Sequence, residues 1–206
     1  LAMDTAFLIT AFVTFFVIMD PPGLAPVFAA LTQGMSAQRR RAIALRACLV
    51  AAGVLIAFAA FGESILGFIG ITMPAFRIAG GILLFLTALD MLFERRNQRR
   101  QTRGEEDDHD DPSVFPMAIP LIAGPGTIAT VILLTGQQPG WEGFALVVGV
   151  MLAVLTLNFV FLLGASLIDR ALGKTGIVVV TRLLGMLLAA LAVQFVLDGV
   201  RGFGLA

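Results

Sequence analysis

Cysteine and charge are both scarce in this sequence, and each scarcity excludes a class of protein. Cys48 is the single cysteine, so an intramolecular disulfide is impossible and no metal-thiolate site is expected. Only 14% of the 206 residues are charged, and the 14 basic and 14 acidic residues cancel. A net charge of zero gives no electrostatic reason to expect nucleic acid as a partner. Phosphate-binding glycine loops, zinc-ligand spacings and nucleophile elbows are also missing, so we expect neither an enzyme, an ATP-driven pump nor a cofactor.

Apolar residues, by contrast, are abundant and come in long runs. They make up 58% of the chain, and the mean hydropathy of +0.95 lies outside the range of soluble domains. Each run is close to the ~20 residues that a helix needs to cross a bilayer. We therefore predict an all-α, six-helix transmembrane bundle. Its spans are expected near residues 5–31, 42–62, 75–93, 114–136, 141–167 and 177–200. No basic residue precedes the first run, so we do not expect a cleaved signal peptide there.

A charged stretch at residues 94–113 divides the apolar chain into two parts. Five arginines are followed by the acidic run 105–111, in which His109 is embedded. Such a composition cannot bury a core and indicates a solvated cytoplasmic linker, which we favour over a metal-binding tract for His109. The predicted organisation is thus a first three-span unit at 1–93, the linker, and a second three-span unit at 114–206.

The distribution of lysine and arginine predicts the orientation in the membrane. Eleven basic residues fall in the loops on one side, and only Arg201 falls on the other. The eleven are Arg39, Arg40, Arg41, Arg46, Arg95, Arg96, Arg99, Arg100, Arg103, Arg170 and Lys174. We therefore expect an integral protein of a bacterial-type cytoplasmic (inner) membrane, surrounded by lipid, with both termini outside the cytoplasm.

The two units carry matching landmarks in the same order. When Pro22-Gly23 is aligned with Pro125-Gly126, further pairs of identical residues align at the same offset or within two residues of it. These pairs are Ile65 with Ile168, Gly70 with Gly173, Thr72 with Thr175, Arg77 with Arg182 and Gly80 with Gly185. Because each unit has an odd number of spans, the second must enter the membrane from the opposite side. The expected architecture is two inverted three-helix repeats in which helices 1 and 4 are broken, a pattern of secondary transporters.

The breaks themselves are the candidate binding site. Proline and glycine interrupt a helix at membrane depth, where lipid offers no partner to the freed backbone groups. Inversion points the two outgoing half-helices toward each other, so their N-termini are expected to bind an anion. Asp20 and the carbonyl ends of the incoming halves favour a cation, and the glycines leave room only for something small. The expected ligand is a small zwitterion, with a sodium ion or proton coupled at Asp20. The expected substrate-binding residues are Asp20, Pro22, Gly23, Gly124, Gly126, Thr127 and Asn158.

Structural alternatives exist for each of these residues. Proline and glycine are common in membrane helices and can simply kink them. Asp20 can serve as the N-cap of the following half-helix, alone or in addition to a coupling role. Arg77 and Arg182 lie about one turn inside their spans, where an arginine either extends to lipid headgroups or forms a gating salt bridge.

At these residues the sequence resembles the MarC family of membrane proteins. The resemblance rests on Asp20-Pro21-Pro22-Gly23-Leu24-Ala25-Pro26-Val27-Phe28, Arg77-Ile78-Ala79-Gly80-Gly81 and Pro120-Leu121-Ile122-Ala123-Gly124-Pro125-Gly126-Thr127-Ile128. It extends over essentially the whole chain, although the family usually has a bulkier residue at the position of Pro22. The family is grouped with small neutral amino-acid transporters, which implies six spans and a glycine- or alanine-like substrate.

We therefore expect a secondary transporter of small neutral amino acids that works by alternating access. One alternative is an exporter of another small metabolite or a drug. A second, from a different class, is a non-transporting membrane scaffold or a passive channel. Oligomeric state, coupling ion and transport direction are not encoded in these patterns, and a homo-oligomer is compatible with them.

Overall fold

The computed structural model describes residues 5–93 and 111–204. These residues form helices joined by short turns, and no strand occurs among them. The elements are α1 (Thr5–Met19), α2 (Pro21–Leu31), α3 (Ala37–Ile69), α4 (Met73–Leu92), η1 (Ser113–Ile122), α6 (Pro125–Gln137), α7 (Trp141–Leu163) and α8 (Ala165–Gly202). The expected all-helical class is confirmed, and most of the linker at 94–113 lies outside the described residues.

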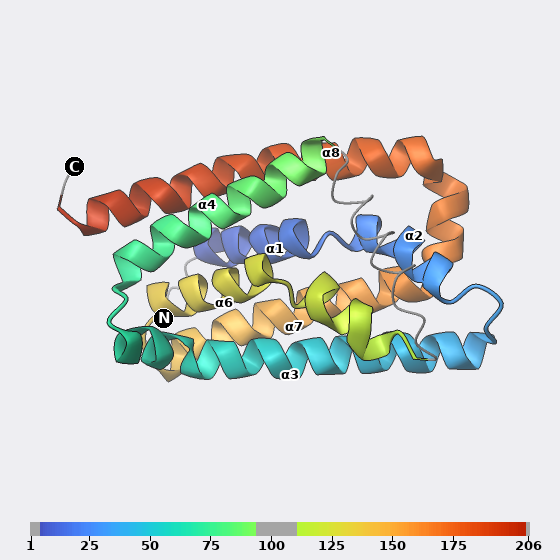
Figure 1. The fold of residues 1–206 in the computed structure, drawn as a ribbon, viewed down its shortest axis with the longest axis horizontal. Coiled ribbons are helices and arrows are strands. Elements are labelled where there is room, and N and C mark those ends of the chain that lie inside the picture. The colour runs from blue at the N-terminus through green and yellow to red at the C-terminus, as the bar shows by residue number, and fades with distance from the viewer. Residues whose placement is uncertain (1–4, 94–110, 205–206) are drawn as a thin grey trace.

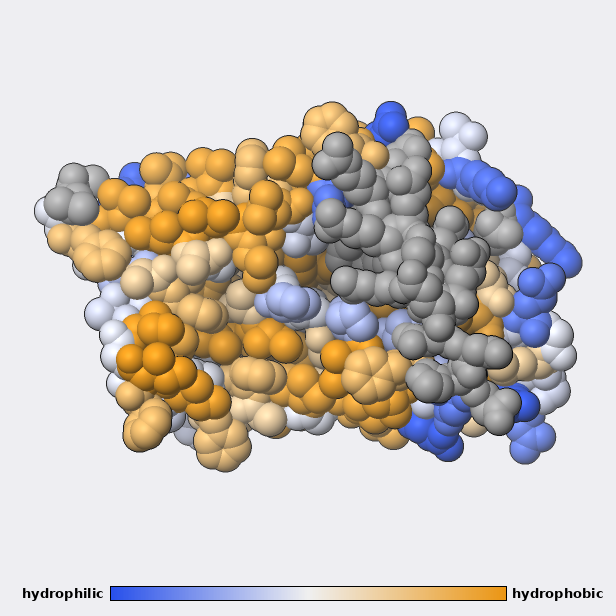
Figure 2. Space-filling view, in the orientation of Figure 1, coloured by the Kyte–Doolittle hydropathy of each residue, from blue (hydrophilic) through white to orange (hydrophobic). Residues whose placement is uncertain are grey.

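The helices have the length and surface of membrane spans. Among the described residues, five segments are long and apolar enough to cross a bilayer, with α1 and α2 counted together. The bent pair η1 and α6 makes a sixth if it is taken as one span. Large apolar side chains face outward, including Phe68 at 94% exposure. Figure 2 shows that they cover most of this face, while hydrophilic residues gather at one end. An apolar exterior of this extent suits lipid and not water.

Two helices are longer than the hydropathy pattern predicts. The stretch 63–74 was expected to be a connection, but α3 continues to Ile69 and ends only at Gly70, whose φ is +83°. The stretch that contains Arg170 and Lys174 was expected to be a loop; it is helical on either side of a kink at Gly173, whose φ of 61° and ψ of 175° are non-helical. In both stretches the chain stays helical up to a glycine with a positive φ, a conformation that glycine adopts readily. These glycines are Gly70 and Gly173, the latter with φ +61°.

Polar side chains define where α3 and α4 begin. The Ser36 hydroxyl accepts a hydrogen bond from the Arg39 N–H at 3.3 Å, and the Thr72 hydroxyl accepts one from the Ala75 N–H at 3.4 Å. Each side chain satisfies an N–H that the first turn of its helix leaves without a partner. The α3–α4 turn is therefore set locally, by Gly70, which ends α3, and by the Thr72 hydroxyl, which caps α4.

The helices form a bundle whose ends differ in chemistry. Figure 1 shows that both ends of the described chain lie at the same end of the bundle, while the α2–α3 turn lies at the opposite end. That opposite end also carries the Arg46–Asp111 ion pair, which joins α3 to the residues before η1. Figure 1 further shows both helix breaks about halfway along the long axis. The fold therefore positions the two breaks in the interior.

Helices α4 and α8 lie against each other along most of their length (Figure 1). Glycines make this close approach possible. A Cβ added at Gly81 would lie 2.8 Å from the Ala192 carbonyl oxygen, and one added at Gly199 would lie 2.9 Å from the Pro74 carbonyl oxygen. Small residues that bring backbones together are the usual means by which membrane helices associate.

Candidate functional site

Asp20 forms the first break, between α1 and α2. It is fully buried and adopts the left-handed conformation, with φ 52° and ψ 62°. Its backbone N–H still donates to the Phe16 carbonyl at 3.0 Å, so α1 is intact up to this residue. Its side-chain Oδ1 accepts from the Gly23 N–H at 3.2 Å. Aspartate tolerates this conformation better than most residues because its short carboxylate can bond the nearby backbone. The alternative role of Asp20 as an N-cap is thus observed.

The cap changes what the N-terminus of α2 can bind. Pro21 and Pro22 occupy its first turn as expected and have no N–H to donate. The Gly23 N–H is bonded to Asp20 Oδ1, and the Leu24 N–H donates to the Asp20 carbonyl at 3.0 Å. Every donor of this turn is therefore absent or occupied. In this conformation the Asp20 carboxylate is itself the anion at the N-terminus of α2, and substrate binding at Asp20, Pro22 and Gly23 stays a prediction.

Gly23 allows the close approach of the Asp20 carboxylate. A Cβ at this position would lie 2.1 Å from Asp20 Oδ2, so the missing side chain makes room for that carboxylate. Pro22 and Gly23 are buried, as Asp20 is. The first break is a compact unit that holds a carboxylate in the interior of the bundle.

The second break, between η1 and α6, is irregular over a longer stretch. We expected an ordinary half-helix before it, but η1 is a wide helical segment whose backbone is non-helical at Phe115 and Ile119. Each of these residues precedes a proline, and proline disfavours the α conformation in the residue before it. Hydrogen bonds five residues apart replace the usual ones, as in Ala123 N–H to the Ala118 carbonyl at 2.8 Å. The axes of η1 and α6 are bent by 55°.

The N-terminus of α6 differs from that of α2. Gly124 is its N-cap residue, and no side chain of the described residues caps it. Pro125 occupies the first turn and has no N–H, while the Ile128 N–H donates to the Gly124 carbonyl at 2.9 Å. The first-turn amides of Gly126 and Thr127 thus have no side-chain cap. With the helix dipole behind them, they are the better candidate for an anion.

Thr127 braces the second break. Its hydroxyl donates to the Ile122 carbonyl at 2.9 Å, which ties the end of η1 to the first turn of α6. The side chain is 3% exposed. Gly124 is also buried, and a Cβ there would lie 2.6 Å from the Pro120 carbonyl oxygen. Both residues therefore have a local structural function, and the Thr127 oxygen keeps the capacity to accept a further hydrogen bond.

The two breaks meet in the middle of the bundle. A Cβ added at Gly126 would lie 2.9 Å from Ile18 Cδ1 and 3.5 Å from Leu84 Cδ2. Ile18 stands two residues before Asp20, so the first turn of α6 packs on the end of α1. The structure thereby brings the carboxylate-bearing break and the uncapped helix N-terminus to the same depth (Figure 1). An apolar isoleucine side chain occupies the contact between them.

Asn158 presents a second buried polar group. It lies on α7, the helix that packs against α1, α2 and α3. The residue is 0% exposed, yet neither its Oδ1 nor its Nδ2 has a hydrogen-bond partner. Buried amide atoms are nearly always paired, because an unpaired one costs about 1–3 kcal/mol. Of the expected site residues, Asn158 is the one whose side chain lacks a partner that a ligand or water would supply.

The two arginines singled out in the sequence are placed differently. Arg77 is half-buried on α4, and its Nε is enclosed without a hydrogen-bond partner. Arg182 is exposed on α8. The preceding residue, Thr181, is 2% exposed and its hydroxyl has no partner, a feature that our sequence reasoning did not identify. The sequence signal that could have identified Thr181 is a threonine next to an arginine in an apolar run.

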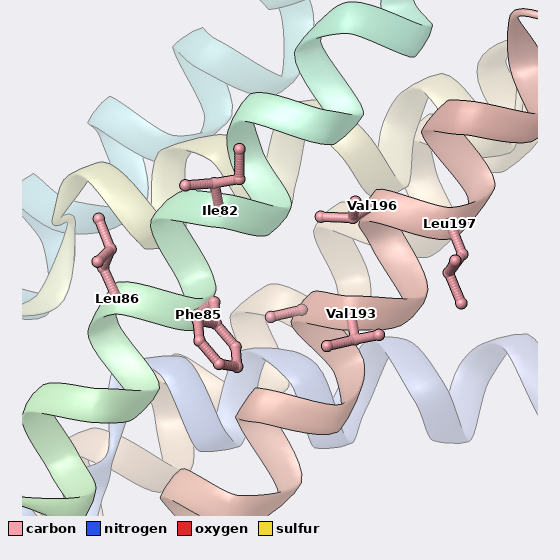
Figure 3. A pocket seen from close by; sticks show the side chains of 7 residues that line it. Ile82, Phe85, Leu86, Val193, Val196 and Leu197 are labelled. Carbon is pink, nitrogen blue, oxygen red and sulfur yellow. The ribbon is translucent and has the colours of Figure 1, made fainter.

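Two pockets on the described part of the chain lie away from the breaks. One, of about 240 Å³, is lined only by apolar residues of α4 and α8. Figure 3 shows six of them, Ile82, Phe85 and Leu86 on α4 and Val193, Val196 and Leu197 on α8. A lining without polar atoms suits acyl chains and not a zwitterion. The other pocket, of about 270 Å³, is polar and lies between α3, α6 and α7.

Comparisons with known proteins place this architecture in a family. The family profile described as "MarC family integral membrane protein" matches residues 5–203. The UPF0056 membrane protein MJ1677 of Methanocaldococcus jannaschii is 38% identical over 203 residues, covering 97% of this chain and 98% of that protein. The UPF0056 inner membrane protein YhgN of Escherichia coli K12 is 40% identical over 196 residues, covering 94% and 96%. No solved structure matches the chain. With a match over nearly its whole length, the chain belongs to the MarC family of integral membrane proteins.

Proposed function

We propose that this protein is a secondary transporter of small neutral amino acids, of the size of glycine or alanine. The observation that carries the proposal is the meeting of the two breaks at Gly126 and Ile18. One break holds a buried carboxylate, and the other presents a helix N-terminus without a side-chain cap. A substrate with an ammonium and a carboxylate group has one pole for each. Broken helices that meet near the membrane centre are typical of secondary transporters.

The proposed architecture behind this function is a pair of inverted repeats. Gly70 and Gly173, which align in the sequence, both have a positive φ; Gly70 ends α3, and Gly173 forms the kink in α8. Aligned elements also have related neighbours: α3 packs on η1 as α7 packs on α1, and α2 packs on α7 and α8 as α6 packs on α3 and α4. Helices α4 and α8, which align with each other, form one contact. These correspondences support a twofold relation between residues 1–93 and 114–206.

The buried position of the Asp20 carboxylate supports the proposal that a coupling ion binds there. A carboxylate at the bilayer centre costs at least ~2.5 kcal/mol if it stays charged. The Gly23 N–H offsets part of that cost. A proton, a sodium ion or the substrate ammonium group would offset more, so occupancy at Asp20 would change the stability of the surrounding conformation. That coupling is what a secondary transporter requires.

The conformation described here is closed at the breaks. Ile18 packs on Gly126, so a ligand between the two poles has to displace the isoleucine side chain. We propose that rocking one repeat against the other separates α1 from α6 and admits substrate from one side at a time. Asn158 would then gain the hydrogen-bond partner that it lacks here.

The proposed placement is a cytoplasmic membrane, with both termini outside the cytoplasm. YhgN, the Escherichia coli relative, is described as an inner membrane protein. The end of the bundle that carries Arg46 and the α2–α3 turn would face the cytoplasm, in agreement with the positive-inside rule. Single cysteines at Gly34 and Pro139, in a Cys48→Ala background, test this with an impermeant thiol reagent on intact cells. Only the position-139 variant should react; the reverse pattern contradicts the orientation.

Uptake into proteoliposomes tests the transport proposal. Purified protein should accumulate labelled glycine or alanine in a saturable manner when a sodium or proton gradient is imposed, and glycine should raise the melting temperature in detergent. Counterflow with a panel of solutes separates an amino-acid carrier from an exporter of other metabolites or drugs. A scaffold or passive channel predicts neither saturable uptake nor stabilisation by glycine, and that result would refute the proposal.

A further inference from the structure

The polar pocket between α3, α6 and α7 has no role in the site described above. It is about 270 Å³ in volume and is lined by Ala59, Ala60, Glu63, Ser64, Thr135, Pro139, Gly140 and Phe144. Pockets that hold drug-sized ligands span ~300–1,000 Å³, so this one suits something smaller. It lies at the end of the bundle where the described chain begins and ends (Figure 1).

Aromatic residues place this pocket at the level of the membrane surface. Phe144 lines it, and Trp141 stacks on Phe144 with ring centroids 5.4 Å apart. Trp141 is 77% exposed. Tryptophan side chains of membrane proteins concentrate where hydrocarbon meets water. The pocket therefore lies at the level of the aqueous boundary, where a solute arrives.

The lining carries one sign of charge. Glu63 is the only ionisable residue among the eight, and Ser64 and Thr135 add hydroxyl oxygens. The Thr135 hydroxyl donates within its own helix, to Val131 and Ile132 carbonyls at 2.8 and 3.0 Å, so toward the pocket its oxygen can only accept. A carboxylate with acceptor oxygens beside it favours a cation that donates hydrogen bonds. A primary ammonium group meets that description.

A contact between the two units lies next to residues of the pocket lining. Gly62, one residue before Glu63, faces Ile132, one turn before Thr135. A Cβ at Gly62 would lie 2.5 Å from Ile132 Cγ1, so the isoleucine fills the space that the glycine leaves. Ile132 is on α6, the helix that begins at the second break, six residues from Gly126 and ~9 Å along the axis. Along α6, Ile132 thus stands between the second break and Thr135 of the pocket lining.

We propose that this pocket is the outer vestibule of the transporter. It binds the ammonium group of a small amino acid at Glu63, and Ile132 seated on Gly62 separates it from the central site. This inference rests on the proposed transport function for the identity of its ligand. It adds a second binding site at the membrane surface and names the side chain that has to move before substrate reaches Gly126.

Thiol labelling tests the vestibule without relying on transport. Ser64→Cys, nearly isosteric, places a thiol in the lining once Cys48 is replaced by Ala. A cationic trimethylammonium methanethiosulfonate should react with it faster than the anionic sulfonate analogue. Adding Glu63→Gln should lower the ratio of the two rates by about fivefold or more, the effect of one charge a few ångströms away in water. Trp141→Cys, outside the lining, is the matched control and should keep its ratio. An unchanged ratio at position 64 would overturn the proposal.

Protection experiments identify the ligand class. Glycine and methylammonium should both slow labelling of the Ser64→Cys variant, and acetate should not. Equal protection by acetate, or none by methylammonium, contradicts an ammonium site. If Glu63 controls labelling while no saturable uptake is found, the transport proposal fails and the cation site stands. If uptake is saturable but labelling ignores Glu63, the vestibule alone fails.

The proposed barrier, Ile132 seated on Gly62, is tested by truncating the isoleucine. A thiol at position 127, in the first turn of α6, should be labelled slowly in the Cys48→Ala background because Thr127 is 3% exposed. Truncating the gate with Ile132→Ala should accelerate that labelling, with Ile132→Val as the milder variant if the first does not fold. Leu133→Val, a truncation at the neighbouring buried position of the same helix, should not accelerate it. Equal rates with and without the Ile132 truncation would contradict the assignment of Ile132 as the barrier.

Discussion

Gly126 in α6 and Ile18 in α1 are in contact at the centre of the bundle, and a Cβ at position 126 would lie 2.9 Å from Ile18 Cδ1. The contact joins the two helix breaks although the residues are far apart in the sequence. The Ile18 atom in this contact, Cδ1, is at the far end of a flexible side chain and is not a backbone atom. The breaks are thus held together by a contact that a rotation of one isoleucine can loosen.

Substitution of Gly126 should therefore separate folding from transport. Gly126→Ala should fold, because Ile18 Cδ1 can give way, and should reduce glycine uptake. Gly126→Leu should block uptake and abolish the stabilisation of the protein by glycine. Ile18→Ala in the Gly126→Ala background should restore part of the uptake, since it removes the atoms with which the new methyl group collides. Uptake and melting temperature in detergent are the measurements.

The matched control is Gly149→Ala on α7, where an added Cβ meets nothing within 4 Å. It should leave uptake unchanged and should slightly favour the helix, by up to about 1 kcal/mol. Normal affinity for glycine in the Gly126→Leu variant would show that the second break does not contact the substrate.

Asp20 combines a structural and a proposed coupling role, and two substitutions distinguish them. Asp20→Asn should keep the cap on Gly23, because asparagine is an equally good N-cap and also tolerates a positive φ. It should nevertheless abolish ion-driven accumulation, since the charge is gone. Asp20→Ala should lose accumulation and, in addition, about 1 kcal/mol of stability with the cap. Accumulation by Asp20→Asn equal to that of the unmodified protein would remove Asp20 from the coupling mechanism.

The sequence predicted the existence and position of both breaks but not their chemistry. Pro22 and Pro125 fall in the first turns of α2 and α6, as expected from proline geometry. It did not predict that Asp20 would turn back on Gly23 and satisfy α2 from within, because that depends on a left-handed φ of 52° at one residue. The symmetry of the motif suggested two anion sites, and the structure retains one candidate.

The structure also differs from the sequence-based expectations in where helices end and in which residues of distant helices contact each other. Helix α3 is longer than the expected span 42–62, because the end of an apolar run does not end a helix, and α3 continues past Glu63 to its cap at Gly70. The contact of Ile132 with Gly62, and the missing partners of Asn158, depend on how distant helices pack. No local pattern encodes such contacts. The expected roles of the site residues themselves stay predictions.

Gly23 should be among the least replaceable glycines for stability. In Gly23→Ala the new Cβ would lie 2.1 Å from Asp20 Oδ2, so the carboxylate has to leave its position on the Gly23 N–H. The cost should be the lost cap, about 1 kcal/mol, together with the burial of a displaced charge. Thermal unfolding in detergent measures it. Gly53→Ala, which meets nothing within 4 Å on α3, is the control; an equal melting temperature for the two variants would contradict the tight cap.

The α4–α8 contact should depend on its glycines. In Gly81→Ala the added methyl would meet the Ala192 carbonyl oxygen at 2.8 Å and the Val196 nitrogen at 3.0 Å. Backbone atoms cannot rotate away, so the helices must separate, at a cost of about 1–3 kcal/mol for overpacking. Gly80→Ala is the neighbouring control, because its methyl would meet the flexible end of Leu133 at 2.8 Å. Gly81→Ala should lower the melting temperature more than Gly80→Ala, and the reverse order would count against the backbone contact.

Asn158 provides the sharpest separation of stability from function. Leucine has nearly the same shape as asparagine but no polar atoms, so Asn158→Leu removes two buried groups that lack hydrogen-bond partners. The ligand-free protein should become more stable, by about 1–3 kcal/mol, while glycine uptake falls. Asn158→Asp, which keeps the shape and adds a charge, should lower stability instead. Melting temperatures without ligand, compared with uptake rates, decide the matter. An Asn158→Leu variant that transports normally would show that this amide has no part in substrate binding, whatever its effect on stability.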